Sequence, residues 1–94
     1  MANPETLNRA VADLRYGVGF SRSVGGSVDC VDDLVPLAVT WLRKADYEVT
    51  DEEHDLAVQI VADELGLLSG HERIMLRQSL RDAGLNGLLD EQEG

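Results

Sequence analysis

The residues that could act as nucleophiles or metal ligands are isolated from one another in this sequence. His71 is followed four residues later by Met75, where a zinc-protease helix needs a second histidine. Asp51 and His54 share one face of a predicted helix, which supplies half of a metal site. No local arrangement activates Cys30 as a nucleophile, so we expect it to be a partly buried small apolar residue. We therefore expect no catalytic residue, no cofactor and no metal.

A nucleotide site is also excluded. The segment Gly17-Val18-Gly19 begins like a dinucleotide-binding fingerprint, but Arg22 occupies the third glycine position and no strand precedes the segment. The chain has no Walker sequence that ends in Lys-Ser or Lys-Thr.

One charge pattern supports a hypothesis. Asp63 and Glu64 end a predicted helix, and the next helix carries Arg73, Arg77 and Arg81 at i, i+4 and i+8. If the two helices are antiparallel, Arg73 can offset Asp63 or Glu64 at the unfavourable end of the helix dipole. Two interpretations stay open: an intramolecular row of ion pairs, or a docking surface for an acidic partner, because arginine binds carboxylates and phosphates bidentately.

The net charge of −10 is unevenly distributed. Residues 1–49 contain seven acids and five bases, whereas residues 50–94 contain eleven acids and three bases. Such an acidic chain repels phosphate backbones and anionic membranes, so nucleic acid is an unlikely partner and a basic or amphipathic protein is favoured. The candidate partner-binding residues are Asp51, Glu52, Asp55, Arg73, Arg77 and Arg81.

Two near-copies of one local signal position these residues. Thr50 with Glu53, and Ser69 with Glu72, have the spacing of capping boxes that start helices. The apolar-periodic runs that follow stop at Gly66 and at Gly84, where a left-handed residue ends a helix. These signals predict helices over 51–65 and 70–83. The inward residues we expect are Ala57, Val58, Val61, Ala62 and Leu65 in the first, and Ile74, Leu76, Leu80 and Ala83 in the second, with Met75 filling a gap.

The first half is expected to hold two further helices. Asn3-Pro4 starts one over 4–16, which should end before Gly17. Residues 17–31 form a long Gly/Ser-rich segment, predicted to be a loop that is mobile or functional. A helix over 33–45 follows, capped by Asp32-Asp33, because an earlier start would place Pro36 in its interior at a cost of about 3 kcal/mol. Trp41 is expected to be a core anchor.

The sequence thus predicts an all-α fold, a compact bundle of four main helices in a single domain over residues 1–94. Leu88 and Leu89 suggest a short fifth turn, followed by a frayed acidic tail at 90–94. We see no signal peptide and no apolar run near the roughly 20 residues that cross a bilayer, so we expect a cytoplasmic protein. One cysteine excludes an intramolecular disulfide. The expected state is a monomer or weak homodimer.

Two resemblances add to this. Gly26-Ser27-Val28-Asp29-Cys30 resembles the prosthetic-group site of acyl carrier proteins, with Gly26 in place of that family's aspartate. This resemblance implies that Ser27, at the start of the second helix, carries phosphopantetheine. Val35-Pro36-Leu37, Val49-Thr50-Asp51-Glu52-Glu53 and Ala62-Asp63-Glu64-Leu65 are similar to a family of small helical actinobacterial proteins of unknown function. That resemblance implies an all-helical fold and no activity.

The favoured function is a non-enzymatic protein-interaction or regulatory module. Its partner would contact the acidic flank of the helix at 51–65 or the Gly-rich segment. The alternatives are a helical DNA-associated regulator that reads through Arg73–Arg81 and an acyl-carrier-like protein. Binding by the DNA regulator would weaken steeply with salt.

Overall fold

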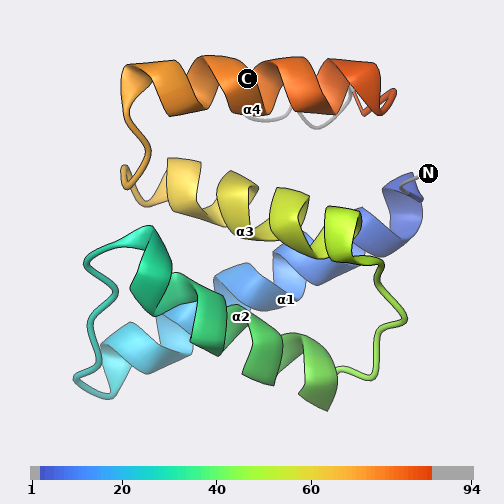
Figure 1. Ribbon diagram of the computed structural model, residues 1–94. Helices are drawn as coiled ribbons and strands as arrows, with labels where there is room; N and C mark the ends of the chain where they lie inside the picture. Colours follow the sequence, from blue (N-terminus) through green and yellow to red (C-terminus); the bar gives the residue numbers. More distant parts are fainter. Residues whose placement is uncertain (1–2, 86–94) are drawn as a thin grey trace.

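The computed structural model describes residues 3–85, which form four helices (Figure 1). They are α1 (Pro4–Ser23), α2 (Val31–Lys44), α3 (Asp51–Glu64) and α4 (Gly70–Asp82). The predicted all-α bundle of four main helices is confirmed. Within the described range no helix is both long and apolar enough to span a membrane.

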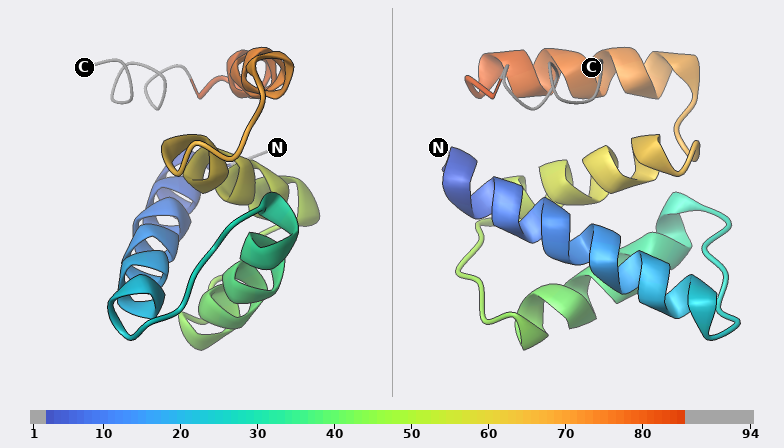
Figure 2. Two further views of the ribbon diagram at one scale, coloured as in Figure 1. Left: turned by 90° about the vertical axis from the view of Figure 1, so that its left-hand side faces the viewer. Right: turned by 180° about the vertical axis from the view of Figure 1, so that it is seen from behind.

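Helix α3 is the centre of the fold. It contacts all three other helices, and α1 also packs directly against α2. Figure 2 shows α4 lying on the far side of α3 from α2, as a separate outer layer. Because of this arrangement α3 buries more of its surface than the other helices, and α4 buries only Leu76 and Leu80.

One hydrophobic core joins the helices. Its largest fully buried side chains are Leu7, Val11 and Leu14 of α1, Leu34 of α2, Ile60 and Val61 of α3, and Leu76 and Leu80 of α4. The predicted inward residues Ala57, Val58, Val61 and Ala62 are all buried.

The predicted helix starts at Asn3, Thr50 and Ser69 are confirmed. Asn3 Oδ1 accepts a hydrogen bond from the Glu5 N–H at 3.0 Å, with Pro4 in the first helical position. Thr50 and Ser69 each accept from the N–H three residues on, and the glutamate there accepts from the cap's own N–H. Both are therefore complete capping boxes.

Glu53 has a second role that the sequence did not show. It is the one buried charged residue among those described, at 4% exposed. Its Oε2 accepts from the Asn3 N–H at 3.0 Å, while Oε1 accepts from the Thr50 N–H and hydroxyl at 3.2 and 3.1 Å. The hydrogen bond from Asn3 is the main cause that holds the pKa of Glu53 below its usual value, against the opposing effect of burial. This carboxylate thus ties the start of α1 to the start of α3.

The helix ends follow one pattern. Gly66 and Gly84 both have φ of +76°, as predicted, and Leu85 N–H donates to the Leu80 carbonyl at 2.8 Å in a Schellman motif. The same geometry ends α2 at Asp46, whose φ of 57° is the only positive value at a non-glycine residue in the described chain. Asp46 therefore occupies a position that glycine fits with less strain.

The predicted end of the first helix near residue 16, and with it the loop at 17–31, is wrong. Helix α1 continues through Gly17 and Gly19 to Ser23, and the connection to α2 covers only residues 24–30. Each helical glycine costs about 1 kcal/mol, but Val18 continues the stripe of Leu14 into the core and is 3% exposed. Burying a valine contributes about 1.5–3 kcal/mol, comparable to the roughly 2 kcal/mol that the two glycines cost together. The Trp41 ring also packs on Gly17, so packing extends the helix past both glycines.

The predicted start of the second helix at residue 33 is also wrong. Helix α2 begins at Val31 with Cys30 as N-cap, and Asp32 lies in the first turn instead of capping. Pro36 therefore lies inside the helix and removes one backbone hydrogen bond. The earlier start adds Val31 to the helix, and its side chain packs against the core, which offsets part of this cost.

Four side chains lie differently from expectation. Ile74 and Met75 were predicted to face inward, yet both are more than half exposed, because α4 packs mainly against α3 and buries only the stripe of Leu76 and Leu80. Cys30 was predicted to be partly buried and is exposed. Trp41, expected in the core, is half-buried at its edge. The predicted fifth turn at Leu88 and Leu89 and the predicted frayed tail at 90–94 lie outside the described residues.

Candidate functional site

The last two turns of α1 carry an exposed apolar row. Tyr16, Phe20 and Val24 follow one another at i, i+4 and i+8, so they stand above one another on the helix surface. Tyr16 is 69% exposed, Phe20 55% and Val24 68%. Large apolar side chains gathered on a surface are typical of contact sites.

Trp41 of α2 packs against the base of this row, next to Tyr16. Its ring centroid lies 6.0 Å from that of Tyr16, with an angle of 43° between the ring planes, and Lys44 Nζ lies 5.9 Å from the Trp41 ring centroid. The ring packs so closely on α1 that a Cβ added to Gly17 would come within 2.5 Å of it. Gly17 is therefore explained by a contact inside the molecule.

Gly19 has no such explanation. A Cβ added there would have no atom within 4 Å, so the position is open to solvent. A glycine inside a helix is destabilising by about 1 kcal/mol relative to alanine. Within the described residues nothing approaches Gly19 to offset that cost.

Two open depressions meet at Gly19. One, of about 340 Å³, is lined by Arg15, Tyr16, Gly19, Phe20 and Ser23 of α1. The other, of about 330 Å³, lies between α1 and α3 and is lined by Arg15, Val18, Gly19, Arg22, Val61, Glu64 and Leu65. We call Arg15, Tyr16, Gly19, Phe20, Arg22 and Ser23 of α1, together with its C-cap Val24, the α1 patch.

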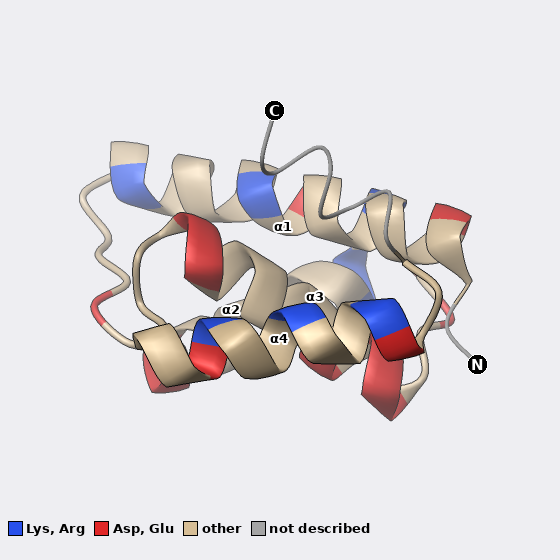
Figure 3. Ribbon diagram, turned by 90° about the horizontal axis from the view of Figure 1, so that it is seen from above, with Lys and Arg blue, Asp and Glu red and all other residues tan. Residues whose placement is uncertain are grey.

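The charges of the α1 patch are basic. Arg15 Nε donates to Glu64 Oε2 at 2.7 Å, and its Nη2 pairs with Oε1, so Glu64 holds the guanidinium in place. Arg22 is exposed and lines the depression between α1 and α3. Figure 3 shows basic positions recurring along α1 and α4. The patch thus combines aromatic and basic side chains on a strongly acidic chain.

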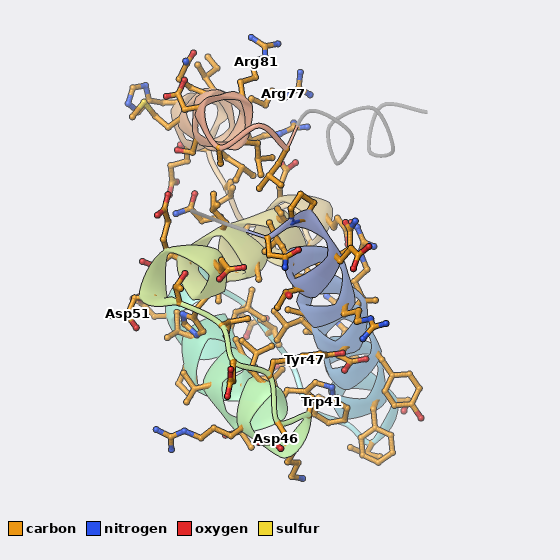
Figure 4. All side chains as sticks on the ribbon, turned by 90° about the vertical axis from the view of Figure 1, so that its right-hand side faces the viewer. Trp41, Asp46, Tyr47, Asp51, Arg77 and Arg81 are labelled. Carbon is orange, nitrogen blue, oxygen red and sulfur yellow. The ribbon has the colours of Figure 1, made fainter. Side chains whose placement is uncertain are left out.

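The six predicted partner-binding residues do not form one surface. Asp51, Glu52 and Asp55 are exposed at the start of α3. Figure 4 shows Asp51 at the start of α3, away from Arg77 and Arg81 on α4. The prediction therefore describes two separate surfaces, one acidic and one basic.

The predicted pairing of the α3 end with Arg73 is present. Arg73 Nε lies 2.6 Å from Asp63 Oδ1, as an ion pair whose angle does not make a well-aligned hydrogen bond. Glu64, the other acid at this helix end, pairs with Arg15 of α1 instead. The ion-pair interpretation thus holds for Arg73, and Arg81 is exposed.

A third depression, of about 320 Å³, lies between the second half of α2 and the start of α3. Arg43, Tyr47, Asp51 and His54 line it together with apolar side chains. His54 Nε2 is buried with no hydrogen-bond partner among the described residues, and its Nδ1 lies 3.4 Å from Asp55 Oδ1. Across residues 3–85 no group of three or more His, Cys, Asp or Glu side chains is placed to hold a metal ion.

Tyr47 lines this depression and is held in place by a contact with α1. Burial and a hydrogen bond to the Asp13 carboxylate raise the pKa of Tyr47 above its usual value, and burial is the larger cause. The contact ties the connection between α2 and α3 to α1.

Ser27, implied by the acyl-carrier resemblance, lies in the connection before α2. Its hydroxyl is 3.5 Å from Asp29 Oδ2, and it precedes the N-cap Cys30 by three residues. The resemblance implies a serine at the start of the helix, so the local geometry differs from the one expected.

Sequence reasoning missed the α1 patch because it ended the first helix too early. The signal was present in the i, i+4, i+8 spacing of Tyr16, Phe20 and Val24, on a different face from Leu14 and Val18. A second apolar stripe beside a buried one indicates an exposed contact surface only once the segment is known to be helical.

Comparison of the chain with protein-family models, with curated proteins and with solved structures finds no match in any of the three. The resemblance to small helical actinobacterial proteins stays a prediction.

Proposed function

We propose that this chain is a non-enzymatic protein-interaction or regulatory module that binds a partner through the α1 patch. The observation that carries the proposal is the row of exposed apolar side chains Tyr16, Phe20 and Val24 beside the open groove at Gly19. Tyrosine, phenylalanine and arginine are enriched at protein interfaces, and lysine and glutamate are depleted there.

The row supplies enough apolar surface to matter. Aromatic side chains bury roughly 150–250 Å² each, and Tyr16 and Phe20 leave more than half of theirs exposed. Covering about 100 Å² on each, at about 25 cal/mol per Å², gives about 5 kcal/mol of gross driving force. Part of this offsets the entropic cost of association, so the estimate supports a contact of moderate affinity.

A second surface belongs to the same proposal. Asp51, Glu52 and Asp55 are exposed around the first turn of α3, and a basic or amphipathic partner segment would complement them. Reversal of Asp51 and Asp55 to lysine should abolish that contact while it leaves binding at the α1 patch intact.

Photo-crosslinking tests the proposal. A benzophenone amino acid replaces Phe20 in the full chain, and in a matched variant it replaces Thr40, which is exposed on α2. After irradiation in the native lysate, we expect a discrete protein adduct from position 20 that excess unlabelled protein competes away. Equal adducts from both positions, or none from position 20, would overturn the proposal.

A further inference from the structure

The shape of the α1 surface is suited to packing against a second helix. The row Arg15, Gly19, Ser23 lies between the tall apolar row of Tyr16 and Phe20 and the side of the helix that carries Arg22. Such i, i+4 rows are the ridges and grooves along which helices pack, and a row low at Gly19 and Ser23 is a groove. Without a Cβ at Gly19, a second backbone can approach α1 closely there.

The charge around the groove indicates which kind of segment would bind there. Residues 14–28 contain Arg15 and Arg22 and no acid, in a chain with a net charge of −10. Glu64 of α3 also lines the groove and pairs with Arg15, which leaves Arg22 as the positive charge there that no acid of the lining pairs with. Lys44 adds a further positive charge beside Trp41, which lies under Tyr16. An acidic segment complements this region, whereas a basic one is repelled by it.

We infer that the α1 patch binds an amphipathic helix of another protein, which places an apolar ridge in the groove at Gly19 and acidic side chains beside Arg22 and Lys44. This inference rests on the proposed function and adds the class of partner and the mode of docking. It keeps the amphipathic partner that the sequence favoured and excludes the basic one for this surface, because the sequence did not place basic and aromatic residues together.

A second copy of this chain fits the groove poorly. The acidic helix α3 has its apolar face buried in the core. The exposed apolar residues Ile74 and Met75 lie on α4, which carries Arg73, Arg77 and Arg81, so α4 would bring positive charge to a positive patch. Neither α3 nor α4 of a second copy therefore complements the groove, and we assign the complementary helix to another protein.

The test uses a displayed library of 18-residue amphipathic helices. Positions on the flanks vary among Glu, Gln and Lys, and positions on the apolar face among Ala, Leu and Met. Selection against the full-length protein should enrich Glu on the flanks. The strongest binder, made as a peptide, should shift the amide resonances of residues 15–24 in an NMR titration.

Two variants make the result specific. Gly19→Leu fills the groove and should weaken binding at least tenfold, with an unchanged or higher melting temperature, because leucine is the better helix former. Gly70→Leu is the matched control: Gly70 is the other helical glycine with no atom within 4 Å of its missing Cβ, and it lies on α4. This variant should bind as the parent does.

Four outcomes would overturn the inference: enrichment of Lys on the flanks, equal binding by Gly19→Leu, the absence of any binder, or a dimer in sedimentation that Gly19→Leu abolishes. An adduct from position 20 in the crosslinking experiment, together with one of these outcomes, would leave the proposed function standing and remove only the acidic helix. Failure of both experiments would remove both.

Discussion

The buried carboxylate of Glu53 gives a sharp test of how α1 is held against α3. Its two oxygens accept three hydrogen bonds, from the Asn3 N–H and from the Thr50 N–H and hydroxyl. In Glu53→Gln the amide oxygen can replace only one carboxylate oxygen, and the amide NH₂ then faces a buried donor. An unsatisfied buried donor costs about 1–3 kcal/mol, and the remaining bonds lose their charge assistance. We expect a loss of about 2–3 kcal/mol in the free energy of unfolding at pH 7.

Glu72→Gln is the matched control, because Glu72 has the same place in the second capping box. Its carboxylate accepts only from the Ser69 N–H and is exposed, so the amide can turn to water and the loss should be about 0.5–1 kcal/mol. For a chain of this size each kcal/mol shifts the melting temperature by roughly 4–8 °C, so thermal unfolding separates the two variants.

The pH dependence has a definite sign. Because the folded-state pKa of Glu53 lies below its ordinary value of 4.5, the carboxylate stabilises the fold above that pH. The stabilisation is lost as the pH falls through the folded-state pKa, where the protonated acid resembles the amide. Urea unfolding between pH 7 and pH 3 should therefore show a gap between parent and Glu53→Gln that closes at low pH. Equal losses in the two Gln variants, or a gap that is unchanged at pH 3, would refute the reasoning.

Three further predictions follow from individual residues. Gly17→Ala places a methyl group 2.5 Å from the Trp41 ring. The overpacking costs about 1–3 kcal/mol, which exceeds the gain in helix propensity of about 1 kcal/mol. The melting temperature should therefore fall, and the tryptophan emission should change. Asp46→Gly relieves a left-handed backbone at φ of 57° and should raise stability by about 0.5–1 kcal/mol in urea unfolding; a loss would show that the aspartate side chain stabilises the turn. The exposed Cys30 thiol should react with a disulfide reagent in the native protein within a fewfold of its rate in urea, and strong protection would contradict its placement.

The parts of the fold that the sequence predicted are those where local chemistry decides the structure. The capping boxes at Thr50 and Ser69 and the left-handed ends at Gly66 and Gly84 involve residues within a few positions of one another. No distant neighbour had to be known. Helices α3 and α4 were therefore predicted to within one residue at each end.

The errors arose where distant residues decide. Trp41 packs on Gly17, and the buried Val18 carries α1 beyond the point where helix propensity would end it. Ile74 and Met75 were assigned to the core because apolar residues usually face inward, but among the described helices α4 packs mainly against α3. The candidate site inherited the first error, since the residues expected to form a loop are the helical turns that carry the exposed row.

The two glycines that were taken as the end of α1 now have different physical meanings. Both weaken the helix by about the same amount, about 1 kcal/mol each. At Gly17 the Trp41 ring occupies the space that a side chain would need, so the fold itself uses the missing Cβ. At Gly19 the space is open, it joins two depressions, and exposed aromatic and basic side chains stand beside it. Since no contact within the described chain offsets the cost at Gly19, a contact with another molecule is the physical reason we assign to it, and Gly19→Leu separates the two roles because only binding should suffer.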